Sequence, residues 1–147
     1  MDTRTLVGED RRRGLGPPLS DDESKDLAKL VENDQKAEAV AVFWWLEDEA
    51  EEYQFVVAYG DYEFRGPRKL YAIILDKLKL MDVDRKLPLT QVWVMPDSHP
   101  VLQTLRTICG SGRNIVITNC HVNGVTVREA IVLFIKKRRA GTRRLKR

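Results

Sequence analysis

Residues 37–59, AEAVAVFWWLEDEAEEYQFVVAY, decide the fold because they hold two apolar runs with a short acidic segment between them. Residues 37–46 are rich in Val, Phe and Trp and contain no breaker, and residues 53–59 repeat that composition. Both runs are typical of largely buried strands. Because the acidic segment 47–52 is short and Gly60 follows the second run, the stretch predicts an antiparallel hairpin.

Two adjacent tryptophans, Trp44 and Trp45, lie in the first of these runs. Successive side chains of a strand point to opposite faces of the sheet, so we expect one indole in the core and the other on the second face. A helix that covers this second face is the expected arrangement. The alternative is an exposed indole that anchors a partner protein.

Helical patterns flank the hairpin on both sides. Ser20 and Glu23 have the spacing of a capping box, which predicts a short amphipathic helix over residues 21–34. A proline at the first helical position and a continuous apolar stripe predict a helix over 67–81. A third apolar helical pattern, which Ser98 could cap, covers residues 98–109.

Residues 90–95 and 114–119 have the composition of two further strands. Each follows a predicted helix, so we expect strand–helix–strand crossovers that place both strands parallel to residues 53–59. The segment after them is ambiguous. Asn123-Gly124 favours a hairpin and a strand over 125–135, whereas a second capping-box spacing favours a helix over about 127–139. Of the two, we favour the helix.

The sequence thus predicts an α/β protein with a mixed sheet in a two-layer or three-layer arrangement. Its single domain covers residues 20–135. Residues 1–19, with two prolines, three glycines and Arg11–Arg13, have the composition of a flexible arm. Residues 136–147 form what we call the basic tail.

Charge is distributed unevenly along the chain. The 147 residues carry 25 Lys and Arg and 22 Asp and Glu, a net charge of +3, but the basic tail alone holds eight cations and no acid. The rest of the chain holds 17 cations and all 22 acids, which gives it a net charge of −5. An acidic body with a basic end indicates a polyanionic partner. The candidate nucleic-acid-binding residues are Lys136, Lys137, Arg138, Arg139, Arg143, Arg144, Lys146 and Arg147.

The composition also bears on location. No apolar run approaches the roughly 20 residues of a membrane helix, and the first 19 residues lack the apolar segment of a secretory signal. Cys109 and Cys120 do not by themselves form a disulfide framework or a zinc site. We therefore expect reduced thiols, no membrane partner and a cytoplasmic location.

The predicted parallel strands would gather polar side chains at one edge of the sheet. Ligands bind at the carboxyl edge of open α/β sheets. The candidate catalytic residues there are Asp61, Asp97, His99 and His121, and the candidate metal ligands are Asp61, Glu63 and Asp97. Carboxylates that share a hard cation could hold Mg²⁺ beside a proton-shuttling histidine. The ordinary alternative is that these side chains satisfy turn and helix-cap backbone.

Three functions are compatible with these features. The first is non-specific nucleic-acid binding through the basic tail, assisted by Arg11–Arg13. The second is a metal-assisted hydrolase at the carboxyl edge, with phosphodiesters as its candidate substrate class. The third is a homodimeric structural or adaptor module that uses the acidic hairpin and the Trp pair. Residues 20–52 hold twelve acids against three lysines, and the basic tail could dock on this acidic patch in cis or across a dimer. The sequence leaves open whether the protein is an enzyme.

Overall fold

The hairpin expected over residues 37–59 is present, with β2 (Ala39–Leu46) antiparallel to β3 (Gln54–Tyr59) and Trp44 opposite Phe55. The structure is a computed structural model that describes residues 4–6 and 16–137. All eight residues of β2 are buried, because β2 lies between two other strands and both of its faces are covered. This strand is the centre of the molecule.

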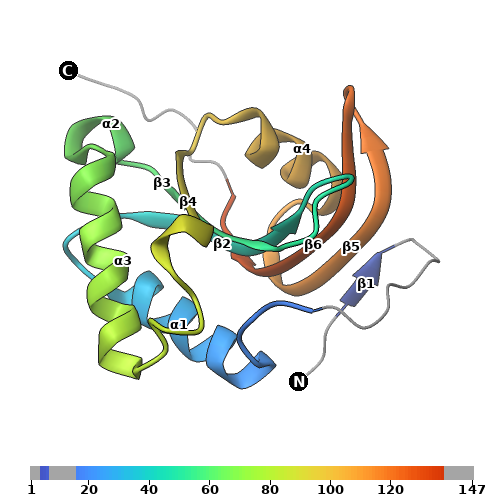
Figure 1. Cartoon of the computed structure of the whole chain (residues 1–147). Coiled ribbons are helices and arrows are strands. Elements are labelled where there is room, and N and C mark those ends of the chain that lie inside the picture. The colour runs from blue at the N-terminus through green and yellow to red at the C-terminus, as the bar shows by residue number, and fades with distance from the viewer. Residues whose placement is uncertain (1–3, 7–15, 138–147) are drawn as a thin grey trace, which may run out of the picture.

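Six strands form one mixed sheet in the order β1-β5-β6-β2-β3-β4 (Figure 1). The strands not yet located are β1 (Arg4–Leu6), β4 (Val92–Pro96), β5 (Gly112–Val122) and β6 (Val125–Ile135). Strand pairing is parallel between β3 and β4 and between β1 and β5, and antiparallel elsewhere. Hence β3, β4 and β6 run in one direction, and β1, β2 and β5 run in the other.

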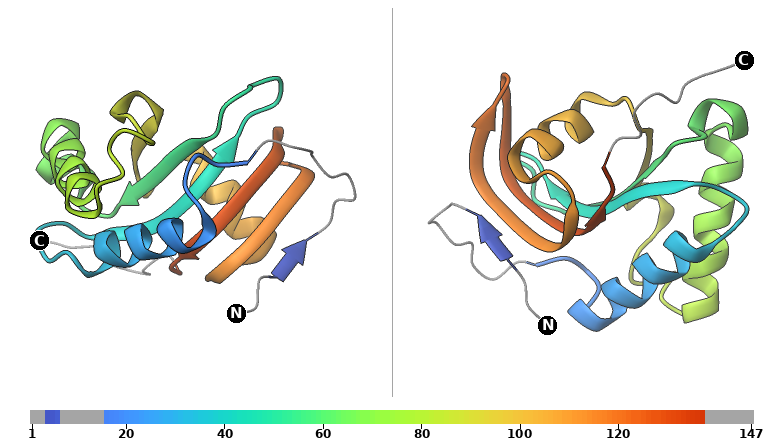
Figure 2. Two further views of the ribbon diagram at one scale, coloured as in Figure 1. Left: turned by 60° about the horizontal axis from the view of Figure 1, so that its bottom comes forward. Right: turned by 180° about the vertical axis from the view of Figure 1, so that it is seen from behind.

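Helices cover both faces of the sheet and make three layers (Figures 1 and 2). One face packs against α1 (Asp21–Asn33) and α3 (Pro67–Met81), and the other against α4 (Pro100–Cys109). The single turn α2 (Tyr62–Arg65) and the 3₁₀ turn η1 (Leu89–Gln91) precede α3 and β4. The α/β class with a mixed sheet is confirmed, and of the two expected arrangements the three-layer one is present.

The two tryptophans face opposite layers, as the strand pattern predicts. Trp44 is 1% exposed in the core beneath α1 and α3, and Trp45 is 3% exposed in the core beneath α4. Both indoles are buried, so neither can serve as the exposed anchor that the adaptor hypothesis requires.

Local signals placed three helices correctly. The Ser20 side chain accepts from the Glu23 backbone N–H at 3.1 Å and the Glu23 carboxylate accepts from the Ser20 N–H at 2.9 Å, which is the expected capping box of α1. Pro67 stands at the start of α3. The cap of α4 is His99 rather than Ser98, since the His99 ring nitrogen Nδ1 accepts from the Val101 N–H at 3.1 Å.

The helix expected over residues 127–139 is wrong, because residues 125–135 form strand β6. Asn123 and Gly124 adopt φ of 52° and 79°, the two positive values of a type I′ turn, and join β5 to β6. The expected second capping box does not form. Thr126 Oγ1 lies 2.8 Å from His121 Nδ1, and Glu129 accepts a hydrogen bond from the Tyr53 hydroxyl. Cross-strand partners replace the helix cap.

The parallel placement of residues 114–119 is also wrong. The crossover β3–α3–β4 is parallel as expected, but β5 lies beside β6 and runs opposite to β3 and β4. The connection through α4 therefore leads from β4 at one edge to β5 in the other half of the sheet, instead of to a strand beside β4. The cause is the β5–β6 hairpin, which pairs with β2 through β6 and so occupies the other half of the sheet.

Part of the N-terminal segment belongs to the core and the sheet. Leu19 is already part of the core, and Arg4–Leu6 form the short strand β1, which the sequence did not predict. The remainder of 1–15, including Arg11–Arg13, lies outside the described residues.

Within the part of the chain that the structure describes, no helix has both the length and the apolar character required to cross a membrane.

Candidate functional site

The carboxyl edge of β3 and β4 brings Asp61, Asp97 and His99 together, as the sequence predicts. The two strands are adjacent and parallel, with Tyr59 beside Pro96, and the Asp97 N–H donates to the Tyr59 carbonyl at 3.2 Å. Asp97 follows β4 directly, Asp61 comes two residues after β3, and His99 comes three residues after β4. Their close placement is a consequence of the parallel crossover.

Both carboxylates of this edge are already engaged by protein groups. Asp61 accepts from the Glu38 N–H at 3.0 Å and from Arg65 Nε at 3.1 Å. Asp97 forms an ion pair of 2.7 Å with Arg106, whose side chain is only 11% exposed. Arginine keeps its charge at every relevant pH, so each carboxylate already has a permanent counter-ion.

No metal centre is apparent at this edge. Glu63 lies on α2 and is exposed. Among the described residues, no group of three or more His, Cys, Asp and Glu side chains is arranged to hold a metal ion. The acids at this edge instead connect structural elements. Asp61 bonds to Glu38, which precedes β2, and to Arg65 of α2, and Asp97 pairs with Arg106 of α4.

His121 and Cys120 lie at the opposite edge. Because β5 runs against β3 and β4, its end lies where those strands begin, so His121 does not join His99. Burial raises the pKa of the Cys120 thiol, which disfavours the thiolate needed for nucleophilic attack. The expected convergence of all four candidate catalytic residues is therefore wrong for His121, which hydrogen-bonds within its own hairpin.

His99 has a structural role that is sensitive to acid. Its ring accepts a backbone N–H at the start of α4 and lies edge-on against Trp93, with ring centroids 5.1 Å apart. Burial lowers the pKa of the imidazole. An imidazole protonated on both nitrogens can no longer accept the Val101 N–H, so protonation removes this helix cap.

We predict that the free energy of unfolding falls between pH 7.5 and pH 5.5 in part because of His99. Since the folded-state pKa lies below the unfolded value of about 6.5, the unfolded chain binds the proton more readily, and the contribution is full above that value and is lost as pH falls through the folded pKa. The half-exposed ring limits the effect to less than the ~1 kcal/mol of a lost N-cap. Urea unfolding of His99→Asn, which keeps a cap without titrating, should show a smaller acid loss; an unchanged loss would contradict the assignment.

A cationic groove that the sequence did not reveal lies between α1 and the β5–β6 hairpin. It has a volume of about 220 Å³, and its lining includes Lys25, Lys29, Glu32, Arg113 and Phe134. Arg113 forms a bidentate pair with Glu32 at 3.0 and 2.8 Å, which raises the pKa of Arg113 and lowers that of Glu32. The side chain of Arg113 is nevertheless 59% exposed.

The basic tail begins beside this groove. The Lys136 ammonium lies 5.7 Å from the Phe134 ring centroid, and the Arg113 guanidinium lies 5.5 Å from the same ring. The Lys136 N–H donates to the Val40 carbonyl at 2.9 Å, and the Lys136 carbonyl accepts from Arg106 Nε at 3.0 Å. Of the eight tail cations, Lys136 and Lys137 are described and exposed, whereas Arg138, Arg139, Arg143, Arg144, Lys146 and Arg147 lie outside the described residues.

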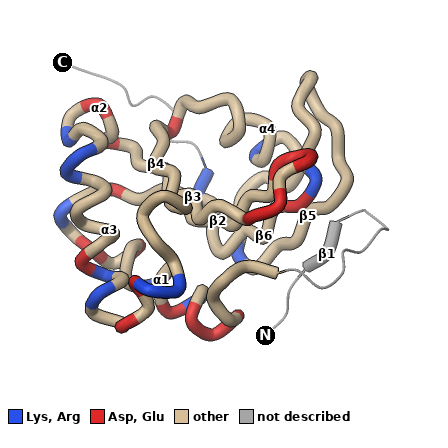
Figure 3. Tube along the Cα trace, in the orientation of Figure 1, with Lys and Arg blue, Asp and Glu red and all other residues tan. Residues whose placement is uncertain are grey.

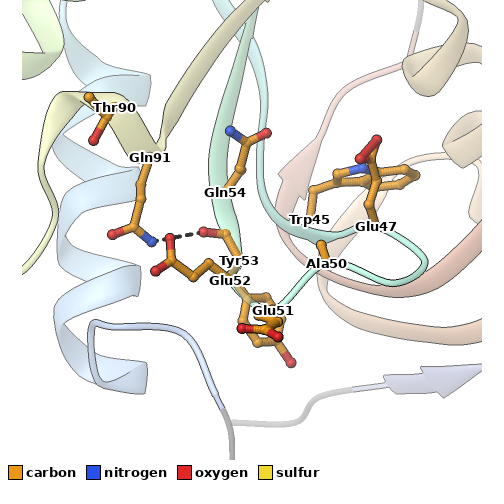
Figure 4. A pocket seen from close by; sticks show the side chains of 9 residues that line it. All are labelled: Trp45, Glu47, Ala50, Glu51, Glu52, Tyr53, Gln54, Thr90 and Gln91. Carbon is orange, nitrogen blue, oxygen red and sulfur yellow. Dashed lines mark hydrogen bonds between the residues drawn. The ribbon is translucent and has the colours of Figure 1, made fainter.

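An acidic pocket of about 430 Å³ lies at the opposite end of β2, where the hairpin turns toward β3 (Figure 4). Figure 4 labels its nine lining residues, of which Glu47, Glu51 and Glu52 carry charge. We call this the hairpin pocket. The groove and the pocket therefore lie at opposite ends of the sheet and have opposite charge.

Comparison with known proteins adds no functional information: the chain matches no protein-family model, no curated protein and no solved structure. The functional argument therefore depends on the residues and their arrangement.

Proposed function

We propose that this protein binds nucleic acid non-specifically through the cationic groove and the basic tail that begins beside it. The observation that carries the proposal is the position of Lys136, which brings the start of the tail onto the same Phe134 ring as Arg113 and within 3.8 Å of Glu32 in the groove. Cations from three separate parts of the chain thus form one surface. A phosphate backbone is the polyanion that such an extended surface would follow.

The charge balance of this surface favours an anion. Lys25, Lys29 and Arg113 line the groove together with one acid, Glu32, and the Lys136 ammonium lies 3.8 Å from that carboxylate. Asp21 pairs with Lys25 at 3.2 Å, so four cations against two acids leave an excess of two positive charges before the rest of the tail is counted. Figure 3 shows acids gathered at the turn of the β2–β3 hairpin, and both cations and acids along α1.

The groove has the chemistry for phosphate contact and lacks the chemistry for base recognition. Phe134 is 1% exposed beneath Arg113 and Lys136, so its ring orders the two cations and cannot stack on a base. Phosphate contacts position a protein on nucleic acid without reading sequence. Binding should accordingly depend strongly on salt and weakly on sequence.

A groove variant tests this proposal. We expect Lys29→Gln with Arg113→Gln to reduce the slope of log affinity against log salt by about 2 and to weaken binding about tenfold or more at 50 mM salt. The measurement is fluorescence anisotropy with labelled single-stranded and duplex oligonucleotides of two unrelated sequences. Thermal unfolding of the same sample establishes that the variant is folded.

The matched control is Lys79→Gln with Arg85→Gln, which removes the same charge from two exposed cations at the far end of α3 and the loop after it. We expect a much smaller loss of affinity for this control. Equal losses for the two variants would mean that net charge alone, and not the groove, governs binding. Absence of binding by the full chain at 50 mM salt would overturn the proposed function.

A further inference from the structure

The cationic groove contains an anion of its own. Among the described residues that line it, Glu32 is the only acid. Its Oε1 accepts from Arg113 Nη1 at 3.0 Å, and its Oε2 accepts from Arg113 Nη2 at 2.8 Å. The same Oε2 lies 3.8 Å from the Lys136 ammonium. One carboxylate oxygen therefore lies between a guanidinium of β5 and the first ammonium of the basic tail.

The two cations are positioned by contacts that do not involve Glu32. The buried Phe134 ring has the Arg113 guanidinium 5.5 Å and the Lys136 ammonium 5.7 Å from its centroid. The Lys136 backbone N–H also donates to the Val40 carbonyl at 2.9 Å. Ring and backbone contacts keep the two cations near each other, whichever anion lies between them.

A phosphate group is the other anion that suits this arrangement. The fork of a guanidinium binds carboxylates and phosphates in the same bidentate manner, through two parallel N–H groups. We propose that Glu32 makes an autoinhibitory contact: its carboxylate occupies the position of a nucleic-acid phosphate on Arg113 and Lys136, and a phosphate displaces it on binding. This inference rests on the proposed function, because it concerns the regulation of the same groove.

The exposure of the three side chains permits such an exchange. The side chains of Arg113 and Lys136 are 59% and 48% exposed, whereas that of Glu32 is 16% exposed. The cations are thus open to an anion that arrives from solution. Water and salt screen ion pairs with an exposed partner, so these pairs contribute little to stability and can be replaced without disruption of the fold.

Glu32 competes as a charged group. Its hydrogen bonds with Arg113 hold the pKa of the carboxyl below its ordinary value, so the group is ionised at neutral pH. When a phosphate displaces it, the carboxylate is left without a partner and takes up a cation from solution. This uptake offsets one of the counterions that the nucleic acid releases.

Removal of the carboxylate should therefore strengthen binding. We expect Glu32→Gln, which keeps the size of the side chain, to steepen the slope of log affinity against log salt by about 0.9. One additional released counterion corresponds to about tenfold tighter binding at 50 mM salt. Fluorescence anisotropy with the labelled oligonucleotides used for the groove variant measures both quantities, and thermal unfolding of the same sample establishes that the variant is folded.

The matched control is Asp26→Asn. Asp26 is an exposed acid of the same helix that does not line the groove, so the substitution makes the same change in net charge outside the site. We expect a much smaller gain in affinity for this control. Equal gains for the two variants would show that net charge, and not the contact with Arg113, limits binding.

A second pair of chains tests whether Glu32 acts through Arg113. In the Arg113→Gln background no guanidinium remains to be released, so Glu32→Gln should give a clearly smaller gain than it gives in the unmodified chain. Equal gains in both backgrounds, or unchanged or weaker binding by the Glu32→Gln single variant while the unmodified chain binds, would overturn the autoinhibitory contact and leave the proposed function in place. Absence of binding by both chains would overturn the two proposals together.

Discussion

Truncation after Lys137 should reduce nucleic-acid affinity by about 10³-fold at 50 mM salt while the fold is retained. It removes Arg138, Arg139, Arg143, Arg144, Lys146 and Arg147. Each phosphate contact contributes about 0.9 to the slope of log affinity against log salt, so the loss of six contacts lowers this slope by about 5. Anisotropy titrations between 50 and 200 mM salt measure both quantities.

The position of the cut follows from the structure. Removal from Lys136 onward would also delete the N–H that bonds to Val40 and the carbonyl that bonds to Arg106, and would therefore disturb the sheet and α4. A cut after Lys137 leaves these contacts in place. Unfolding by urea should give the same midpoint for the truncated and full chains. Equal nucleic-acid affinity of the two chains would show that the tail is not the binding element.

Trp44→Ala should lower the free energy of unfolding by about 3–5 kcal/mol, the range for truncation of a fully buried aromatic side chain. Trp44 contacts Phe55 edge-on at a centroid distance of 5.0 Å, and its indole Nε1 donates to Ser24 Oγ at 3.0 Å. The substitution therefore opens a cavity and also leaves the buried Ser24 hydroxyl without this donor. It also removes the hydrogen bond between α1 and the central strand.

Equilibrium urea unfolding followed by circular dichroism measures this loss. The matched control is Phe64→Ala, because Phe64 is 80% exposed on α2 and its truncation should change stability by less than about 0.5 kcal/mol. A loss below about 1 kcal/mol for Trp44→Ala would mean that α1 and α3 do not pack on this face of the sheet as described.

Elements with strong local signals were predictable from the sequence. The capping box of Ser20 and Glu23 determines where α1 begins, and Pro67 with its apolar stripe determines α3. The β2–β3 hairpin follows from two β-rich runs around an acidic turn. In each case the residues that decide the structure lie within a few positions of one another, so their interactions act before the rest of the chain folds.

Strand β6 shows where such reasoning fails. Consecutive residues Val132, Leu133, Phe134 and Ile135 are all buried because β6 lies between β5 and β2 with both faces covered. A strand buried on both faces has no alternation, and its apolar positions also fit a helix. Glu129, which has the spacing of a helix cap, is instead held by Tyr53, 76 residues away in the sequence. Tertiary pairing overrides the local preference.

The candidate sites divide in the same way. That Asp61 and Asp97 lie at one edge follows from the strand–helix–strand pattern, but their engagement by Arg65 and Arg106 required side-chain positions. The cationic groove joins Lys29 to Arg113, which are far apart in the sequence. No local pattern could have indicated it.

The amino-acid order alone determined the charge asymmetry, the α/β class and the helices and hairpin whose signals are local. Only the folded chain decided that β5 runs against β3 and β4, that the edge carboxylates already have arginine partners, and that cations and acids collect at opposite ends of the sheet. The physical reason is that strand order and direction depend on contacts between distant residues, whose energies are realised only when both faces of the sheet are covered.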